Sequence, residues 1–230
     1  MKHLGLIMDG NRRWAREHKF QVAFHGYNYA IDAIKTAIEF AIEKKIEYLS
    51  LFALALDNFE KRASEEKEYL WDLMIQLFGS DAFELKKHGI CIKFIGDQTV
   101  FPSKVTELIK TLENDTKDLT TLHLNILFCY GGKQEIIAAT KKLAEDVSNG
   151  KLNPIDITEQ KFRQALWCGD IPDPELIIRT GKHSRLSNFL TFQSTFTEFC
   201  FPDCYWPDLN KKLLEECFIV YTKAQRNFGI

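Results

Sequence analysis

The sequence carries almost no excess charge, because 30 Lys and Arg residues are balanced by 32 Asp and Glu residues and the formal net charge is -2. This balance argues against a general nucleic-acid binder, although a basic pocket can exist inside a neutral total. No apolar run reaches the roughly 18 residues that a membrane-spanning helix needs, and no signal-peptide pattern opens the sequence. We therefore expect a cytoplasmic protein that binds no nucleic acid.

Cysteine pairs of the kind that bind zinc are also missing. The six cysteines form no C-x-x-C motif and no zinc-like ligand group; they are Cys91, Cys129, Cys168, Cys200, Cys204 and Cys217. We expect reduced, mostly buried thiols, as in most cytosolic proteins. Cys200 and Cys204 are the closest pair, and packing explains them better than metal binding or a redox pair, because no histidine lies nearby in sequence.

Short apolar runs alternate with longer amphipathic segments. This alternation predicts a single α/β domain over residues 1–230, with a mostly parallel central sheet and helices on both of its faces. Several of the apolar runs are apolar throughout, which is typical of parallel strands buried on both sides. The predicted strands are 3–8, 46–54, 90–96, 122–129, 175–180 and, more weakly, 198–202. The predicted helices are 27–45, 64–78, 103–113, 133–148, 158–167 and 208–226.

Polar or glycine-rich residues follow the first five of these strands. In open α/β sheets, ligands bind beyond the carboxyl ends of the strands, so this edge is the predicted site. The segments that follow the strands are Asp9–Arg13, Asp57–Phe59, Gly96–Asp97, Tyr130–Lys133 and Arg179–Gly181. None of them is a nucleotide-binding fingerprint, because Gly-x-Gly-x-x-Gly is missing and "YGGKQE" lacks the P-loop frame. Nucleotide binding is therefore a weak alternative.

The segment "MDGNRRWA" (8–15) combines one acid with two arginines directly behind the first strand. A strand-to-helix turn at Asp9 and Gly10 would present backbone N–H groups to an anion, and Arg12 and Arg13 would add guanidinium groups suited to phosphate oxygens. A carboxylate beside such a seat fits a Mg²⁺ ion held between protein and phosphate. The alternative is that Asp9 caps a helix and the arginines form surface ion pairs.

A second basic group occurs in "IIRTGKHSRLSNF" (177–189). Arg179 and Arg185 are six residues apart across a loop that contains Gly181, and Ser187 follows. The loop could fold both arginines onto one anion; the alternative is two solvated surface arginines. Two arginine-bearing seats on one sheet edge, together with 18 phenylalanines, favour two phosphorylated and partly apolar substrates.

These segments, taken in order, resemble the cis-prenyltransferase family, of which undecaprenyl diphosphate synthase is the best-known type. The resemblance covers essentially the whole chain and rests on "LIMDGNRRWA", "LSLFALALDNFEKR", "FCYGGKQEI" and "LIIRTGKHSRLSNFLTFQSTFTEFCFPDCYWPDL". It implies a single α/β domain with a hydrophobic tunnel, usually a homodimer. It also implies Mg²⁺-dependent condensation of an allylic diphosphate with isopentenyl diphosphate, which releases pyrophosphate and gives a product expected to associate with membranes.

The resemblance also assigns roles to individual residues. Asp9 takes the position of the catalytic aspartate that engages Mg²⁺, Asn58 that of the proton-handling amide, and Glu198 that of a second metal-associated carboxylate. The substrate-binding positions are Gly10, Asn11, Arg12, Arg13, Trp14, His25, Asp57, Phe59, Lys61, Arg179, Arg185, Leu186 and Ser187. The tunnel walls are expected from the isoleucine stripe of 31–42 and from Leu70, Leu73, Met74, Leu77 and Phe78, with core packing as the alternative for any one of them.

Several positions depart from the family pattern. Val22 stands where the family usually has an arginine, His25-Gly26 replaces a Gly-His pair, and Ala55-Leu56 replaces two serines. Phe59 stands for a tryptophan, Lys61 for an arginine, and Lys182 for the second glycine of "RTGG". His25 either reaches the site or is an ordinary half-buried histidine.

Three functions stay open from these departures. The first is a cis-polyprenyl diphosphate synthase. The second is an atypical member that makes short, branched or cyclised prenyl diphosphates, for example from dimethylallyl diphosphate. The third is a noncatalytic subunit that binds isoprenoid diphosphates. The product chain length, the starter and the dimer surface are not fixed by the sequence.

Overall fold

The structure is a computed structural model that describes all residues except 23–26, 28, 81 and 225–230. Within this part of the chain six strands form one sheet, in the order β3-β4-β2-β1-β5-β6. Every neighbouring pair is parallel, which confirms the predicted parallel sheet. The strands are β1 (His3–Ile7), β2 (Tyr48–Ala55), β3 (Ile90–Ile95), β4 (Leu122–Tyr130), β5 (Leu176–Arg179) and β6 (Glu198–Cys200).

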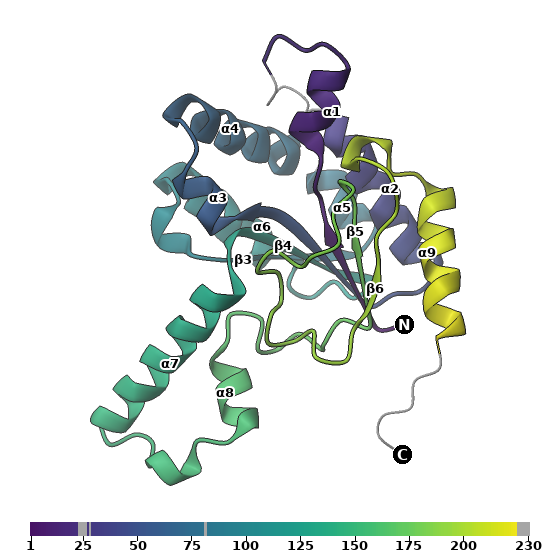
Figure 1. Cartoon of the computed structure of the whole chain (residues 1–230). Coiled ribbons are helices and arrows are strands. Elements are labelled where there is room, and N and C mark those ends of the chain that lie inside the picture. The colour runs from purple at the N-terminus through teal and green to yellow at the C-terminus, as the bar shows by residue number, and fades with distance from the viewer. Residues whose placement is uncertain (23–26, 28, 81, 225–230) are drawn as a thin grey trace.

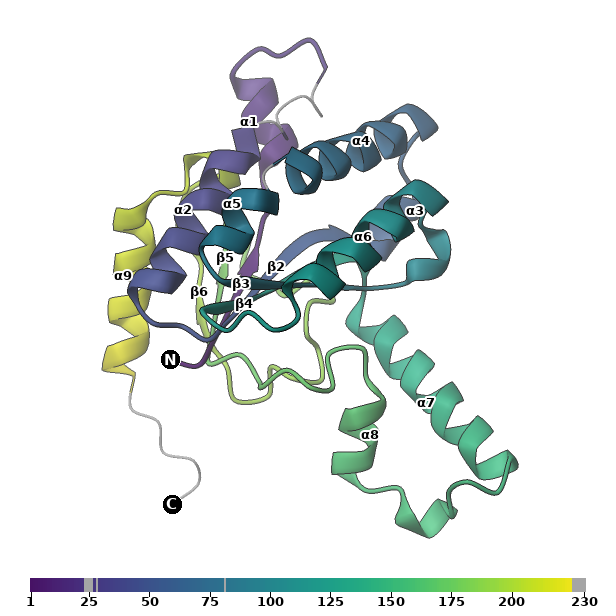
Figure 2. The ribbon, with the colours of Figure 1, turned by 180° about the vertical axis from the view of Figure 1, so that it is seen from behind.

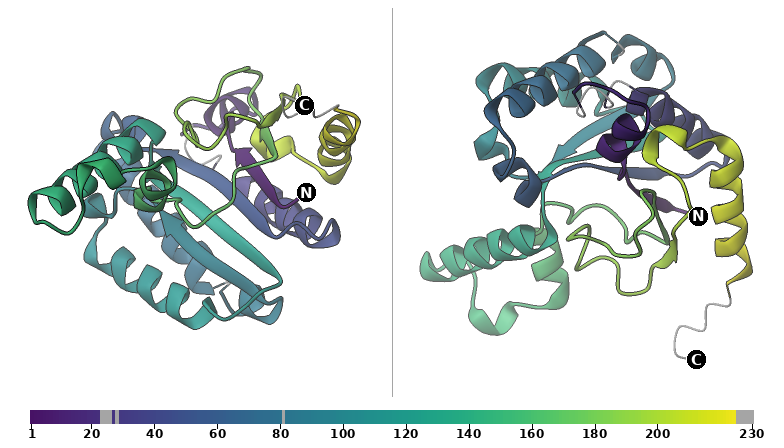
Figure 3. Two further views of the ribbon diagram at one scale, coloured as in Figure 1. Left: turned by 90° about the horizontal axis from the view of Figure 1, so that it is seen from below. Right: turned by 45° about the horizontal axis from the view of Figure 1, so that its top comes forward.

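One face of the sheet is covered by helices, as Figure 2 and the left panel of Figure 3 show. Their apolar sides join alternate residues of the strands in the larger core cluster. These helices are α2 (Ala30–Glu43), α4 (Ser64–Ser80), α5 (Ala82–Lys87), α6 (Ser103–Thr116) and α9 (Lys211–Lys223). They confirm the predicted helices to within a few residues at each end, except α5, which the sequence analysis did not predict.

The other face differs from the prediction of helices on both sides. A smaller core cluster covers it, in which Cys168, Phe189 and Leu190 of the irregular segments before and after β5 (166–175 and 180–197) pack on Phe52 and Ile177 of the sheet. The two helices predicted for this part of the chain, α7 (Gly132–Ser148) and α8 (Glu159–Ala165), instead extend away from the sheet as an arm (Figure 1). Since α7 starts at the end of β4 and points outward, it leaves this face to the irregular segments.

Short helices follow two strands directly. They are α1 (Asn11–Glu17) behind β1, where the sequence predicts a strand-to-helix turn, and α3 (Leu56–Glu60) behind β2, which was not predicted. Three 3₁₀ turns at Gln98–Val100, Pro154–Asp156 and Trp206–Asp208 are shorter still. The two short helices turn the chain sharply at the carboxyl edge of the sheet, where the polar residues lie.

A line of polar side chains crosses the middle of the sheet. His3 Nε2 lies 2.8 Å from Ser50 Oγ, and Asn125 Nδ2 donates to the same hydroxyl at 3.2 Å. His3 Nδ1 lies 2.6 Å from the carbonyl oxygen of Pro172. Burial lowers the pKa of His3 to about 4, so the ring is neutral near pH 7 and its two nitrogens serve one donor and one acceptor role. The arrangement joins β1, β2 and β4 in one register.

The structure corrects the prediction that all six cysteines are reduced. A disulfide joins Cys200 of β6 to Cys217 of α9, with 5.7 Å between their Cα atoms. Cys91, Cys129, Cys168 and Cys204 are free thiols. The pairing could not be predicted from sequence distance, because Cys217 becomes a neighbour of Cys200 only when α9 packs along the edge strand.

Among the described residues, none of the helices has both the length and the apolar character that a membrane span requires.

Candidate active site

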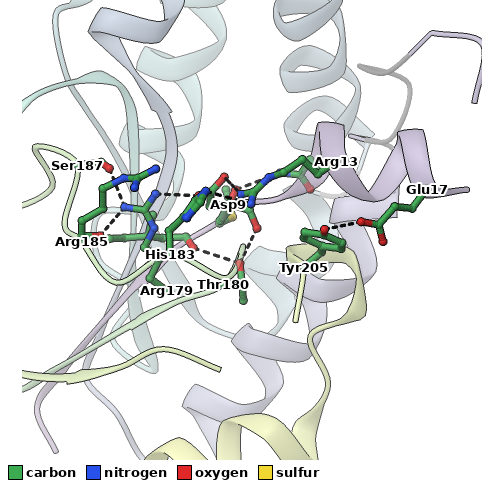
Figure 4. Close-up of polar contacts among 12 residues, drawn as sticks. Asp9, Arg13, Glu17, Arg179, Thr180, His183, Arg185, Ser187 and Tyr205 are labelled. Carbon is green, nitrogen blue, oxygen red and sulfur yellow. Dashed lines mark hydrogen bonds and ion pairs between the residues drawn. The ribbon is translucent and has the colours of Figure 1, made fainter. Parts of the chain in front are cut away.

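The carboxyl ends of β1 and β5 bring Asp9 and Arg179 together. These strands are neighbours, with Ile7 of β1 in register with Arg179 of β5. Arg179 Nη2 donates to Asp9 Oδ2 at 2.8 Å, as Figure 4 shows. The Arg179 side chain is only 4% exposed whereas that of Asp9 is 29% exposed. The carboxylate is therefore anchored from below and open toward the cavity.

The turn after β1 holds Asp9 in place. Arg13, one turn into α1, donates from Nη2 to Asp9 Oδ1 at 3.0 Å, and the Thr180 hydroxyl donates to the Asp9 carbonyl oxygen at 2.8 Å. Both Asp9 oxygens thus face a guanidinium group. This matches the predicted seat in its members and also contains an ion pair of the kind that the alternative interpretation expected, but Asp9 does not cap α1, whose N-cap is Gly10 without a side-chain hydrogen bond.

Two glycines make the close approach possible. Gly10 has a φ of 109° and Gly181 a φ of 88°, a region that other residues rarely adopt. A Cβ on Gly10 would lie 2.6 Å from Cδ1 of Tyr205, and one on Gly181 would lie 2.7 Å from Cγ of Asp9. Any side chain at either place would push the two loops apart, so the seat depends on both.

Arg179 also organises the loop that follows β5. Its Nη1 donates to the carbonyl oxygen of Arg185 and, at 2.7 Å, to Oγ of Ser187. Ser187 itself has a φ of 51°, a left-handed conformation that costs free energy unless the surroundings fix it. Arg185 is exposed and lines the same cavity as Ser187 and Leu186. The structure thus brings the predicted clamp residues together, with Arg179 as its buried member.

His183 is a site residue that the sequence analysis missed. Its Nε2 lies 3.1 Å from Arg13 Nη1, and its ring lines the cavity beside Arg179 and Arg185. Desolvation lowers the pKa of His183, and the nearby positive charge of Arg185 lowers it further. The neutral ring can accept the hydrogen bond from Arg13. In the sequence, His183 stands two residues before Arg185, and this proximity could have indicated that it belongs to the site.

The end of β2 supplies a third group of residues. Asp57 accepts a hydrogen bond from Gln134 Nε2 at 3.0 Å, and Asn58 and Lys61 line the cavity beside it. Phe59 is buried and meets the ring of Trp71 edge-on, with 5.3 Å between ring centroids. Asp57, Asn58 and Lys61 therefore face the site, whereas Phe59 packs in the core below it.

Two further predicted site residues, Trp14 and Glu198, do not line the cavity. Trp14 is buried and donates from Nε1 to Asp208 at 2.7 Å, which fixes α1 to the segment after β6. Glu198 begins β6 opposite Leu176, at the end of the strands far from Asp9, so one chain alone does not place it beside the predicted metal. His25 lies outside the described residues.

A cavity of about 1180 Å³ connects this polar edge to an apolar interior. Its polar mouth contains Asp9, Asn11 and Arg12, and the departures Ala55 and Lys61 line the same cavity. The apolar walls come from α2 and α4, namely Ile31, Ile34, Leu70, Leu73, Met74, Leu77 and Phe78. The predicted tunnel is thus present, although only the first two isoleucines of the 31–42 stripe face it and Ile38 packs in the core.

Glu66 was also missed, and it is the one buried carboxylate among the described residues that line this cavity. Its side chain is near Arg12, Arg62 and the hydroxyl of Tyr27. The sequence "SEEKE" opens the predicted helix 64–78, and carboxylates in the first turn of a helix are commonly exposed. Glu66 stands four residues before Leu70, on the side of α4 that faces inward, and that spacing was the available signal.

The comparisons with known proteins agree with this geometry. The family model described as "Putative undecaprenyl diphosphate synthase" matches residues 7–229. The chain is 37% identical over 230 residues to a geranylgeranyl-diphosphate-specific tritrans,polycis-undecaprenyl-diphosphate synthase of Methanopyrus kandleri, covering 99% of this chain and 84% of the relative. It is 36% identical over 228 residues to an isoprenyl transferase of Thermotoga maritima, covering 99% and 96%.

A solved structure is similar over the full length. Lavandulyl diphosphate synthase from Lavandula x intermedia, in complex with dimethylallyl diphosphate, superposes with a TM-score of 0.94 at 31% identity, covering 100% of this chain and 98% of that one. Fold, sequence and ordered motifs therefore agree, and the chain belongs to the undecaprenyl diphosphate synthase family of cis-prenyltransferases.

Proposed function

We propose that this chain is a Mg²⁺-dependent synthase that joins an allylic diphosphate to isopentenyl diphosphate, releases pyrophosphate and forms a cis-polyprenyl diphosphate. One observation carries the proposal: Asp9 and two arginine-bearing groups meet at the mouth of a cavity with apolar inner walls. A prenyl diphosphate has the same two halves, a charged head and a hydrocarbon tail. The family supports prenyl diphosphate condensation, and the cofactor and chain length are our proposals.

The seat between Asp9 and α1 is assigned to the allylic diphosphate. Arg12 is 48% exposed and Arg13 33% exposed, so both can reach a ligand in the mouth. When the allylic C–O bond breaks, the leaving pyrophosphate gains negative charge. Fixed guanidinium groups stabilise that charge most at the transition state, and removing one such donor costs on the order of 3 kcal/mol.

The clamp of Arg179, Arg185 and Ser187 is assigned to isopentenyl diphosphate. Its double bond attacks the allylic carbon, a new C–C bond forms, and one proton leaves the isopentenyl unit. We assign the handling of that proton to Asn58, which lines the cavity beside the allylic seat. The buried Arg179 keeps the clamp rigid, so the two substrates meet with little loss of orientation entropy at the reacting step.

The residues at the mouth fit a Mg²⁺ ion. Asn11 Oδ1 is buried without a hydrogen-bond partner among the described residues, and the partly exposed Asp9 is two residues before it in sequence. The described chain holds no cluster of three or more His, Cys, Asp or Glu that could hold a metal, which fits an ion held mainly by substrate phosphates and water. When bound, Mg²⁺ would neutralise the diphosphate and assist its departure; Asp9 and Asn11 would hold it.

The proposal is tested by incubating the protein with Mg²⁺, farnesyl diphosphate and radiolabelled isopentenyl diphosphate. We expect extended labelled products and one pyrophosphate per added unit, and loss of both in EDTA. Binding of farnesyl diphosphate without turnover, even at high protein concentration, would instead identify the noncatalytic subunit.

A second candidate is a synthase of short, branched or cyclised prenyl diphosphates. It is favoured by the likeness to lavandulyl diphosphate synthase bound to dimethylallyl diphosphate and by Val22, Ala55 and Leu56, which replace polar family residues. Head-to-middle coupling needs only dimethylallyl diphosphate, whereas elongation needs isopentenyl diphosphate. Mass spectrometry of the products from dimethylallyl diphosphate alone therefore separates the two.

We also propose that the protein acts as a homodimer. The arm of α7 and α8 exposes Ile137 at 55%, Ile155 at 85% and Ile157 at 41%, which is unusual for large aliphatic side chains. Light scattering during size-exclusion chromatography should give twice the chain mass of 26.7 kDa. A single-chain mass at micromolar concentration would refute the dimer.

A further inference from the structure

A charged group lies inside the hydrophobic half of the cavity. Glu66, on α4, is 6% exposed and lines the same cavity as the diphosphate seat. The next wall residues of α4 are Leu70, Leu73 and Met74, which share a helix face with Glu66 because they follow it by four, seven and eight residues. A carboxylate in such a row is costly unless other groups compensate it.

Two residues, Arg62 and Tyr27, provide this compensation. Arg62 Nη1 lies 3.5 Å from Glu66 Oε1, with the two side chains 14% and 8% exposed. The Tyr27 hydroxyl donates to Glu66 Oε1 at 3.0 Å, and burial raises the pKa of Tyr27 to about 12, so the donor keeps its proton. Arg62 also lies over the Tyr27 ring, with Cζ 5.5 Å from the centroid. Arg62 and Glu66 thus form a nearly buried ion pair braced by an aromatic ring.

This group lies between the two halves of the cavity. Arg12 Nη1, which belongs to the diphosphate seat, is 3.9 Å from Glu66 Oε2, and Leu70 begins the apolar wall one helical turn farther along. A hydrocarbon tail that extends from a diphosphate at Arg12 toward Leu70 must therefore pass Glu66. Arg62 Nη1 is buried and makes no hydrogen bond within the described chain, so the charges of the ion pair are incompletely compensated.

We propose that Glu66, paired with Arg62 and held by Tyr27, is a charged gate that restricts how far a prenyl tail extends into the cavity and so favours short starters and short products. The proposal rests on the proposed function, because it concerns the same cavity. A short allylic tail places few carbons beside the ion pair. A longer tail lies along two nearly buried and incompletely compensated charges, and this cost sets a length preference that the apolar walls alone would not impose.

The main test replaces the charge with a group of the same shape. In Glu66→Gln, the ratio of kcat/KM for geranylgeranyl diphosphate to that for dimethylallyl diphosphate should rise about tenfold, equal to about 1.4 kcal/mol, and products should lengthen. Glu68→Gln is the matched control, since Glu68 is exposed on the same helix two residues on, and its ratio should stay at the wild-type value. An unchanged ratio and product length in a folded, active Glu66→Gln protein would overturn the gate.

A second variant guards against misfolding, because Glu66→Gln leaves Arg62 buried without a counter-ion. Arg62→Met with Glu66→Gln removes both charges and should give the same or a larger rise in the ratio. The dissociation constants of unreactive thiolodiphosphate analogues of the two starters, measured by calorimetry, provide a test that does not depend on turnover. If the wild-type protein makes no prenyl product, the proposed function is wrong. The gate is tested separately by the double variant, which should raise the affinity for the longer analogue relative to the shorter one about tenfold; an unchanged relative affinity would refute the gate.

Discussion

Asp9 and Arg179 end two neighbouring strands and face each other in a 2.8 Å ion pair. The guanidinium is nearly buried and the carboxylate is not, so the pair is asymmetric: Arg179 needs Asp9 for charge balance, whereas Asp9 keeps open space toward the cavity. One carboxylate therefore serves both as a structural counter-ion and as the acid at the mouth. Changes at either residue should affect stability and activity to different degrees.

Asp9→Asn should abolish most activity and lower stability. The amide keeps the shape but removes the charge that faces Arg13 and Arg179, and loss of one such electrostatic group costs roughly 10²–10³ in turnover. The buried Arg179 is left without its counter-ion, so the urea midpoint should fall as well. Asp97→Asn is the control, because Asp97 ends β3 at the same sheet edge and only caps a short turn at Thr99. Full turnover by Asp9→Asn would contradict the assignment.

The substitution Arg179→Lys tests whether the site requires the planar guanidinium group, which makes several contacts at once. The guanidinium contacts Asp9, Ser187 and the carbonyl of Arg185 at once, and an ammonium cannot reproduce that geometry. We expect KM for isopentenyl diphosphate to rise roughly tenfold or more, with a smaller change for the allylic substrate, in steady-state assays that vary one substrate at a time.

The control for Arg179→Lys is the same change at Arg163. That guanidinium also makes two contacts, to Asp173 and to the carbonyl of Ile171, but it belongs to α8 outside the cavity lining. Arg163→Lys should leave both KM values near wild type. Equal effects at the two positions would mean that the change acts through general stability.

His3 should make folding stability depend on pH between 6.5 and 4. Its pKa falls from 6.5 to about 4 on folding because the ring is buried, so the unfolded chain binds the proton more readily. Stability from this group is complete above pH 6.5 and is lost as the pH falls toward 4, by roughly 3 kcal/mol in total. Urea unfolding at several pH values should show a shallower slope in His3→Gln than in wild type. His88→Gln, at an exposed histidine, should keep the wild-type slope.

Reduction of the Cys200–Cys217 disulfide should lower stability. The bond closes a segment with a sequence separation of 17, and a loop of this size contributes about 3 kcal/mol by restricting the unfolded chain. Dithiothreitol should therefore lower the melting temperature of wild type but not of Cys217→Ser. Cys91→Ser, at a free thiol, should respond to dithiothreitol as wild type does. No response in wild type would mean that the thiols are reduced in solution, as the sequence first indicated.

The sheet and the main helices were predictable because their signals are local. Runs such as 46–54 and 122–129 are apolar throughout, and buried parallel strands require little else. The arm of α7 and α8 was predicted as helix but not as an arm, since its direction depends on packing that no short segment encodes. The short α1 and α3 follow strands without enough length to show a period.

The site was predictable where the residues follow strand ends, and less so elsewhere. Asp9 and Arg179 were found from their positions after apolar runs. Phe59 and Trp14 were assigned to substrate by resemblance, but their side chains turn into the core. Glu198 starts its strand, as in the predicted run 198–202, and therefore lies at the opposite end of the sheet from Asp9; only the resemblance assigned it to the metal. Glu66 and His183 were missed because charged residues in helices and loops are usually solvated.

The pairing of β1 with β5 has a consequence for synthesis of the chain. Asp9 and Arg179 are 170 residues apart, so β1 has its second neighbour only after three quarters of the protein have left the ribosome. Until then one edge of β1 is unpaired, and an unpaired edge attracts other strands. A fragment that stops before residue 176 therefore lacks the clamp of Arg179, Arg185 and Ser187, and it exposes a strand edge that can pair with strands of other chains.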